Sequence, residues 1–214
     1  MDPQARALFP HLLLEFGEGS TTYGYPDNGG TITLGEGNAC ETFAQFADLD
    51  WRNPDNSSAS SDQVQAAWRA LQVAAAQVRQ NGPKKWPGGG HYASLTTIRA
   101  TQDSINALIQ KRIDQFDSSA RLLWPGWDDA PAPAQDVLMR LMWACGTRGV
   151  YGVNATGWPR LHAAWVAKRW GVTTDDGPGC ADECAIPSLD ETEPGANDRA
   201  RQLFLSCVVP DPAS

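Results

Sequence analysis

The chain has 214 residues, of which 42% are hydrophobic and 20% are charged, so it is long enough for one large core or two lobes. Its formal net charge of −8 argues against nucleic acid as the main partner. No stretch predicts a transmembrane span, and the chain does not begin like a signal peptide. We therefore expect a globular protein that is made in the cytoplasm.

The first predicted element is a helix that ends near Glu18. Apolar residues recur at helical intervals between residues 7 and 14. Gly17 and Gly19 weaken the helix on either side of Glu18, so we expect this carboxylate in the last turn. There the negative end of the helix dipole disfavours the ionised form, which suits a general acid.

A tight hairpin is predicted directly after this helix. Polar and aromatic residues alternate over 21–25 and 31–34, on either side of the turn sequence Pro-Asp-Asn-Gly-Gly at 26–30. Asp27 lies at the turn, and Thr33 lies on the returning strand. The hairpin thus brings a carboxylate and a hydroxyl near the end of the first helix.

Glu18, Asp27 and Thr33 together supply the groups needed to hydrolyse a glycosidic bond. One carboxyl protonates the leaving oxygen, and the other orients or activates a water on the opposite face of the sugar. Each residue alone has a simpler explanation, because Asp caps turns, Glu at a helix end is solvated, and Thr favours strands. The three at this spacing favour the catalytic interpretation, with Glu15 and Glu36 as weaker alternative carboxylates.

This order of residues, followed by Gly-Glu-Gly at 35–37, resembles the catalytic hairpin of the phage-type lysozymes, glycoside hydrolase family 24. The resemblance implies that Glu18 is the general acid, Asp27 the second carboxylate and Thr33 the residue that positions water. The family usually has a His where this chain has Asn38. That His is an ion-pair partner in the family, so its replacement concerns local stability more than chemistry.

Gly35 and Gly37 would let the backbone pass close to a ligand or to a helix. Further along the chain, residues 145–154 resemble the Gly-x-x-Gly-Val-x-Gly stretch of the same family, where a buried helix ends. The family also has an Asn-Arg-Ala element whose Arg pairs with the catalytic Glu. The resemblance implies this role for Arg199, with Arg201 as the competing candidate.

Apolar periodicity predicts five further helices, at about 63–80, 94–123, 135–144, 159–170 and 196–207. A polar, Gly- and Pro-rich insertion separates the last two, at 171–194. We expect a single α+β domain of lysozyme-like fold, mainly helical, with a cleft between two lobes. The small hairpin lobe would cover about 15–95, and the helical lobe about 96–214 together with the N-terminal helix.

Nine tryptophans are many for this length, and aromatic faces stack on sugar rings. Trp86 and Trp127 fall in predicted loops and are the candidates for contact with a glycan, although packing is the commoner role. Trp68, Trp143 and Trp165 fall at apolar helix positions, so we expect them in the core.

Five cysteines are an odd number, so at least one thiol stays free if the others pair within the chain. Cys180 could form a small loop with Cys184, or Cys184 could reach Cys207. Cys145 lies in an apolar segment and is expected to be buried. The scattered histidines form no ligand pair, so we expect neither a metal nor another cofactor: His11, His91 and His162.

The expected activity is that of a muramidase acting on peptidoglycan glycan strands in a cell wall. A lytic transglycosylase, which needs only the acid, and a catalytically silent module that binds glycan or a partner are the alternatives. The acidic charge gives no long-range attraction to an anionic wall, so any attraction would come from a local basic patch of Arg140, Arg148, Arg160, Lys168 and Arg169.

The absence of a signal peptide leaves two settings open. One is a phage endolysin that lyses the host envelope from inside. The other is an antibacterial toxin domain that a contractile type VI secretion machine delivers to the periplasm of a target cell and that an immunity protein inhibits. The acidity is compatible with a basic inhibitor as partner, although a well-solvated surface explains it more simply.

Overall fold

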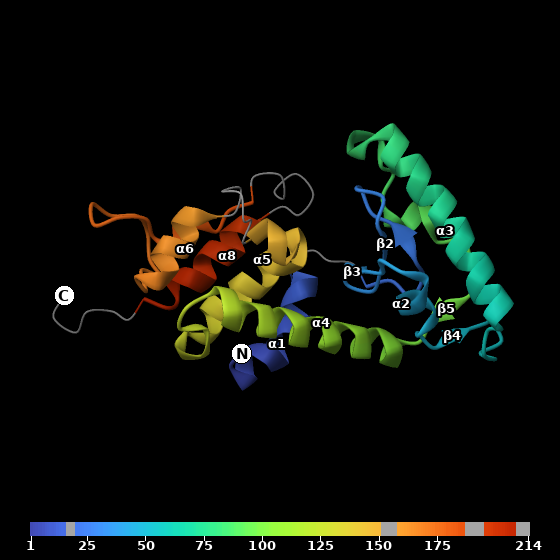
Figure 1. Cartoon of the computed structure of the whole chain (residues 1–214), viewed down its shortest axis with the longest axis horizontal. Coiled ribbons are helices and arrows are strands. Elements are labelled where there is room, and N and C mark those ends of the chain that lie inside the picture. Colours follow the sequence, from blue (N-terminus) through green and yellow to red (C-terminus); the bar gives the residue numbers. More distant parts are fainter. Residues whose placement is uncertain (16–19, 151–157, 187–194, 209–214) are drawn as a thin grey trace. The chain divides into compact units, whose positions relative to one another are not determined.

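The computed structural model describes residues 1–15, 20–150, 158–186 and 195–208 (Figure 1). It is an α+β structure in which helices predominate over a few short antiparallel strands. The chain divides into two compact units, and the boundary expected near residue 95 lies at 112. We call Glu18–Arg112 the hairpin unit, and Met1–Gly17 with Ile113–Ser214 the helical unit.

The hairpin unit contains a three-stranded antiparallel sheet in the order β1-β2-β3. Thr33 in β2 pairs with Tyr25 in β1 and with Ala39 in β3. The bounds of the strands and short helices of this unit are β1 Tyr25–Pro26, β2 Ile32–Leu34, β3 Asn38–Ala39, α2 Phe43–Ala47, β4 Trp51–Arg52, η1 Pro83–Lys85, η2 Gly89–Tyr92 and β5 Arg99–Ala100.

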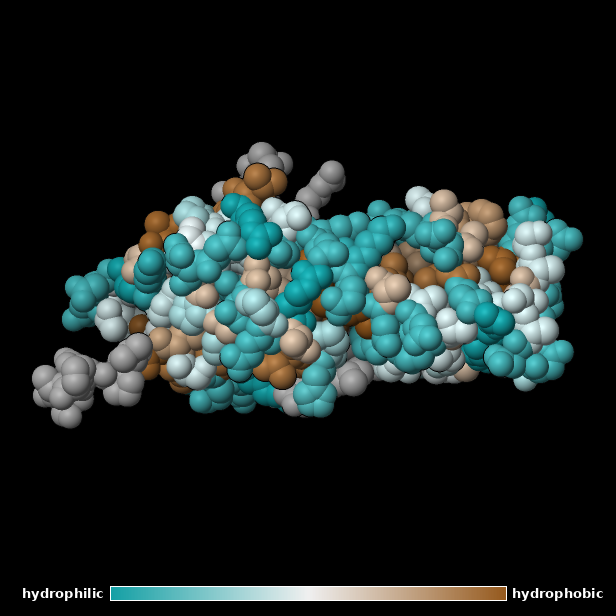
Figure 2. Space-filling view, turned by 90° about the horizontal axis from the view of Figure 1, so that it is seen from below, coloured by the Kyte–Doolittle hydropathy of each residue, from teal (hydrophilic) through white to brown (hydrophobic). Residues whose placement is uncertain are grey.

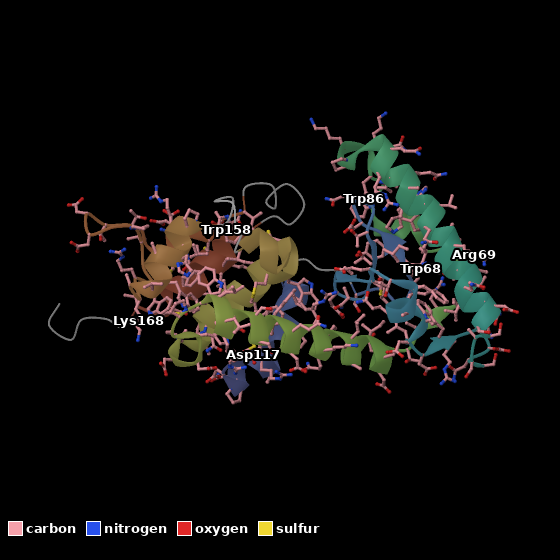
Figure 3. All side chains as sticks on the ribbon, in the orientation of Figure 1. Trp68, Arg69, Trp86, Asp117, Trp158 and Lys168 are labelled. Atoms are coloured by element: carbon pink, nitrogen blue, oxygen red, sulfur yellow. The ribbon has the colours of Figure 1, made fainter. Side chains whose placement is uncertain are left out.

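Helix α3, Ser61–Asn81, is the long helix of the hairpin unit and confirms the helix expected at 63–80. Ser60 begins it with a capping box, in which the Ser60 hydroxyl and the Gln63 side chain each accept a backbone hydrogen bond. One face is buried, and Trp68 lies on it while Arg69 points to solvent (Figure 3). The ring of Trp68 packs 5.2 Å from that of Phe46.

The hairpin packs on α3 through two glycines. A Cβ atom on Gly24 would lie 2.7 Å from the side chain of Leu71, so only hydrogen fits there. A Cβ atom on Gly30 would lie 2.7 Å from the carbonyl oxygen of Ala75, and the φ of Gly30 is +76°. Arg79 of α3 donates a hydrogen bond to the Gly30 carbonyl. These contacts place the hairpin turn directly against the helix.

Helix α4, Gln102–Leu123, begins later than the expected residue 94. The preceding strand β5 pairs with β4, with Ala100 opposite Trp51, so the chain is extended where a helix was predicted. Thr101 then starts the helix, because its hydroxyl accepts a hydrogen bond from the Ser104 amide. The early helix prediction was therefore wrong over residues 94–101.

The helical unit consists of α1 Pro3–Glu15, the second half of α4, η3 Trp127–Asp129, α5 Ala132–Val150, α6 Pro159–Val166, α7 Cys180–Glu183 and α8 Ala196–Leu205. Stacked indoles form much of its core, with the Trp165 ring 5.3 Å from Trp124 and 5.9 Å from Trp127. Trp127 is 2% exposed, so it packs in the core and is not available to a glycan. Helix α6 ends before the expected residue 170, and Lys168 has a φ of 54°.

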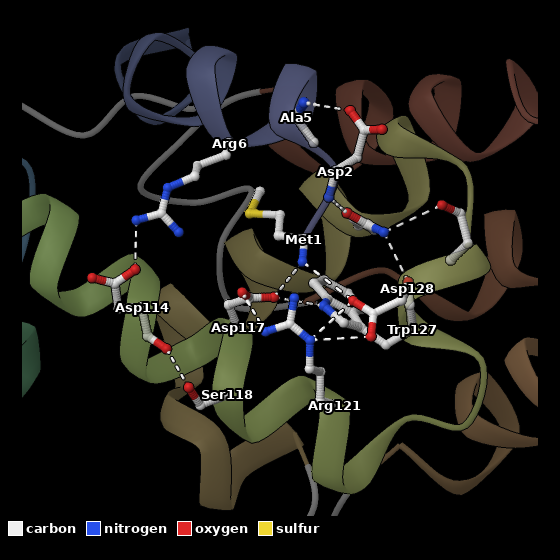
Figure 4. A network of polar contacts seen from close by, with 12 residues as sticks. Met1, Asp2, Ala5, Arg6, Asp114, Asp117, Ser118, Arg121, Trp127 and Asp128 are labelled. Atoms are coloured by element: carbon white, nitrogen blue, oxygen red, sulfur yellow. Dashed lines mark hydrogen bonds and ion pairs between the residues drawn. The ribbon is translucent and has the colours of Figure 1, made fainter.

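Asp117 of α4 organises the polar contacts beside this core (Figure 4). Its Oδ1 accepts hydrogen bonds from the Met1 ammonium, at 2.6 Å, and from the Trp127 indole, at 2.7 Å. Its Oδ2 accepts one from Arg121 at 2.8 Å. Burial acts to raise the pKa of Asp117, but these hydrogen bonds and charges outweigh it and lower that pKa.

The five cysteines lie in described parts of the chain, and none of them forms a disulfide. Cys40 of the hairpin unit is buried, as are Cys180, Cys184 and Cys207 of the helical unit. Cys145 is exposed, which corrects the expectation of a buried thiol. It directly precedes Gly146, whose φ of 69° breaks the regular path of α5.

Within the described residues, no helix is both long enough and apolar enough to cross a membrane. Figure 2 shows a face on which hydrophilic residues predominate and apolar residues occur in small separate groups. This agrees with large apolar side chains that are exposed singly along the chain, such as Val73 in α3 and Leu122 in α4.

Replacing Gly30 with Ala should destabilise the hairpin unit. The new methyl group would overlap the Ala75 carbonyl, and the positive φ would add strain. Gly126→Ala is the control, because Gly126 has a φ of +72° in the left-handed helical region but open space around it. We expect Gly30→Ala to lower the free energy of unfolding by about 1–3 kcal/mol more than the control in urea titrations. Equal losses would contradict the close packing of hairpin and helix.

Asp136 in α5 should make the stability of the helical unit depend on pH. It is 4% exposed, and burial together with the Asp2 carboxylate raises its pKa from 3.8 to about 7. The folded state therefore binds this proton more tightly than the unfolded state, and the free energy of unfolding falls as pH rises from about 4 to about 7. Asp136→Asn should remove this loss, which is on the order of a few kcal/mol.

The measurement is urea unfolding of both proteins at pH 5 and pH 8. The free energy of unfolding of Asp136→Asn should change less between these two pH values than that of the wild type. The variant Asp129→Asn, at an exposed position, should show the same change as the wild type. Parallel curves for the wild type and Asp136→Asn would show that Asp136 has an ordinary affinity for its proton.

Candidate functional site

Asp27 lies half-buried at the turn between β1 and β2. Its Oδ1 accepts hydrogen bonds from the amides of Gly29, at 2.9 Å, and Thr31, at 2.7 Å. Its own amide donates to the Thr31 carbonyl at 2.8 Å. Its Oδ2 accepts no hydrogen bond from the described part of the chain. One carboxylate oxygen therefore holds the turn, while the other is left for a water or a ligand.

Thr33 lies in the middle of β2 and is 4% exposed. Its hydroxyl donates a hydrogen bond to the Thr31 carbonyl at 3.2 Å. Asp27 and Thr33 thus bind the same residue, Asp27 at the Thr31 amide and Thr33 at the Thr31 carbonyl. The structure brings these two predicted site residues together around Thr31, a role for Thr31 that sequence reasoning did not identify.

Glu18, the predicted general acid, lies outside the described residues. The side chain of the alternative carboxylate Glu15 also lies outside them, although its backbone ends α1. The other alternative, Glu36, is a buried residue between β2 and β3. The part of the site that the structure describes is therefore the Asp27–Thr33 pair and its surroundings.

Gly35 was expected to let the backbone pass close to a ligand or to a helix, and the structure shows a close approach to a helix. Its φ is +60°, and a Cβ atom there would lie 2.7 Å from Ile105 of α4. Gly37 also has a positive φ, +76°. Asn38, at the position where the phage-type lysozymes usually have His, is 1% exposed, and its amide group has no hydrogen-bond partner among the described residues. A buried polar group of this kind costs stability.

Trp86 is anchored beside Asp27. Its indole Nε1 donates a hydrogen bond to the carbonyl of Pro26 at 2.8 Å. Figure 3 shows Trp86 between the C-terminal end of α3 and the hairpin. The ring is half-buried, so it packs against the hairpin and also keeps part of its surface accessible. The sequence identified Trp86 as a loop residue, but it did not indicate this contact.

Arg199 and Arg201 lie on α8, in the helical unit. The Nε of Arg201 donates to Asp182 at 3.3 Å, so the competing candidate is already engaged in an ion pair within its own unit. Arg199 is half-buried, and its amide donates to Gly195 at the start of the helix. The expected pairing of Arg199 with Glu18 falls outside the described residues.

Three members of the expected basic patch of the helical unit are buried or engaged in contacts within the unit, whereas Lys168 is exposed. Arg140 is buried, Arg160 pairs with Glu183 at 2.8 Å, and Arg169 donates to the Pro178 carbonyl at 3.1 Å. The side chain of Arg148 lies outside the described residues. Arg160 and Arg169 thus contribute to contacts that hold the unit together.

No protein family, curated protein or solved structure was found to match this chain. In the described ranges, no three His, Cys, Asp or Glu side chains are grouped so that they could hold a metal ion. The geometry around Asp27 and Thr33 is therefore the best indication of the activity of this protein.

Two substitutions at Asp27 should separate its role in the turn from its charge. Asp27→Asn keeps a side-chain oxygen that can accept from Gly29 and Thr31, so its stability should stay within about 0.5 kcal/mol of the wild type. Asp27→Ala removes both hydrogen bonds and should cost about 1–2 kcal/mol. Thermal unfolding checks this, and an Ala variant as stable as the Asn variant would contradict the observed contacts.

Proposed function

We propose that the protein is a peptidoglycan hydrolase of lysozyme-like fold, a muramidase that cleaves the β-1,4 bond between N-acetylmuramic acid and N-acetylglucosamine. The observation that carries the proposal is the convergence of Asp27 and Thr33 on Thr31, which leaves the Asp27 Oδ2 for a water. The order of Glu18, Asp27 and Thr33 along the chain supports it, because it places an acid before a site for water.

In this mechanism Glu18 donates its proton to the glycosidic oxygen, and Asp27 and Thr33 hold the attacking water. The Thr33 hydroxyl already gives its hydrogen to Thr31, so its oxygen can only accept from that water. The Asp27 Oδ2 is also an acceptor. Both hydrogens of the water would then point to the protein, and its lone pair would be left to attack the anomeric carbon with inversion.

One observation favours a second candidate, a module that binds glycan without cleaving it. The Asp27 Oδ1 is occupied by the turn, so the residue has a structural role even in the absence of chemistry. A lytic transglycosylase is the remaining alternative, and it would need neither Asp27 nor Thr33. A muramidase would act on the cell wall whether the protein is an endolysin or a secreted toxin.

Release of reducing ends from purified peptidoglycan separates the three functions. A muramidase creates new reducing ends, a transglycosylase gives anhydro products without them, and a binding module gives no product. Glu18→Gln should lower the rate by roughly 10²–10⁴-fold, because an amide cannot donate the proton. Asp27→Asn should fold but lose activity. Glu15→Gln is the matched control, and loss of activity in it alone would move the acid to Glu15.

The first-formed anomer tests the role of the water. An inverting enzyme needs carboxyl groups roughly 6.5–9.5 Å apart and should first release the α-anomer, which proton NMR detects. An initial β product would mean that Asp27 attacks the sugar directly, and the water-holding role of Thr33 would then be abandoned.

A further inference from the structure

The segment from α3 to β5 carries an exposed pair of cations in an otherwise acidic protein. Lys84 and Lys85 in η1 are two of the four lysines of a chain whose net charge is −8. Both are exposed, and neither forms an ion pair with any residue of the described ranges. Arg160 and Arg169 of the helical unit, by contrast, are engaged in contacts within the fold.

Three contacts fasten this segment to the hairpin. Trp86, directly after the lysines, donates to the Pro26 carbonyl. The backbone of η2 lies against the Tyr25 ring so closely that a Cβ atom on Gly89 would be 3.0 Å from it. Arg99 then lies over the ring of Tyr23, with its guanidinium carbon 5.4 Å from the centroid. The segment is therefore held along β1 and the residues just before it, at one of the two edges of the sheet.

These anchors attach the backbone that carries the lysines to the hairpin turn. Pro26, which accepts from Trp86, is the residue before Asp27. Consecutive Cα atoms are about 3.8 Å apart, so the backbones of Lys84 and Lys85 lie within about 8 Å of the Trp86 backbone. Their long flexible side chains extend this reach. Two unpaired ammonium groups are thus tethered to the turn that carries Asp27.

We propose that Lys84 and Lys85 bind the carboxylates of the stem peptides that peptidoglycan strands carry. This deepens the proposed function and rests on it for the identity of the polymer. Each N-acetylmuramic acid bears a lactyl-linked peptide, and the free carboxylates of that peptide are the anionic groups nearest to the glycan. A peptide of variable conformation suits two mobile point charges better than the fixed fork of an arginine.

The same arrangement explains how an acidic enzyme can stay on an anionic wall. Salt screens the electrostatic effect of the net charge beyond about 10 Å. Two lysines that touch the polymer act at much shorter range, where screening is weaker. The lysines would supply recognition of the peptide-bearing strand, and the hairpin would supply the chemistry. Strands whose stem-peptide carboxylates are neutralised would then be bound less tightly than unmodified strands.

The test is co-sedimentation with insoluble peptidoglycan sacculi, in a Glu18→Gln background so that the strands stay intact. Two forms of the polymer are compared: untreated sacculi, and sacculi whose stem-peptide carboxylates have been converted to amides with a carbodiimide and ammonia, which stay insoluble because their cross-links are kept. Lys84→Gln with Lys85→Gln should bind intact sacculi roughly 3- to 10-fold more weakly than the background protein. On the amidated sacculi the two proteins should bind equally, and the difference on untreated sacculi should shrink as salt is raised.

Arg69→Gln with Lys111→Gln is the matched control, because both residues are exposed cations of the hairpin unit away from the Trp86 anchor. This double variant changes the net charge equally and should bind as the background does. Equal weakening in the control would reduce the effect to net charge and overturn the proposal. Weakening that persists on the amidated sacculi, or no weakening at all, would also overturn it.

Binding and hydrolysis are measured separately, so the two proposals can fail independently. If no reducing ends are ever released but the lysine variant still loses its stem-dependent binding, the muramidase proposal fails and the peptide contact stands. If reducing ends are released and the lysine variant binds both polymers as the background does, the muramidase proposal stands and the peptide contact fails.

Discussion

The hairpin unit depends on the close approach of its β-turn to α3. Gly24 and Gly30 leave no room for side chains at that contact, and Arg79 completes it by donating to the Gly30 carbonyl. Because the turn is pressed against a long helix, the register of β1 and β2 is set at one end. The positions of Asp27 and Thr33 follow from that register, and so does the carbonyl of Pro26 on which Trp86 is anchored.

The charges of the two units are used in different ways. In the helical unit, several acidic and basic groups pair with one another, as Asp117 does with Arg121 and the Met1 ammonium. The charges that form such contacts are already partnered within the fold. In the hairpin unit, Lys84 and Lys85 remain in solvent. The positions of a few exposed charges therefore say more about the function of this protein than its net charge does.

The sequence predicted the elements whose signals are local. Apolar periodicity and the Ser60–Gln63 box indicate α3, and the Pro-Asp-Asn-Gly-Gly turn predicts the hairpin with Asp27 at its tip. The start of α4 was missed because β5 has only two residues, and its pairing partner lies some 50 positions earlier in the chain. No period can be detected in so short a strand.

Contacts between distant residues explain the other differences. Trp127 was expected in a loop that could meet a glycan, but its indole donates to Asp117, and that pairing has no local pattern. The anchor of Trp86 and the shared role of Thr31 are of the same kind. Residue types and spacing indicated Asp27 and Thr33 as a pair, whereas the way in which backbone hydrogen bonds join them required the structure.

Each unit contains buried thiols whose rate of alkylation would report how often that unit opens. Burial raises the pKa of Cys40 in the hairpin unit to about 12, and it does the same for Cys180 and Cys184 in the helical unit. A buried neutral thiol is alkylated only when the surrounding structure opens, whereas the exposed Cys145 is accessible from the start. Mass spectrometry of peptides after timed alkylation would therefore record how often each unit opens, in one sample and without any engineered label.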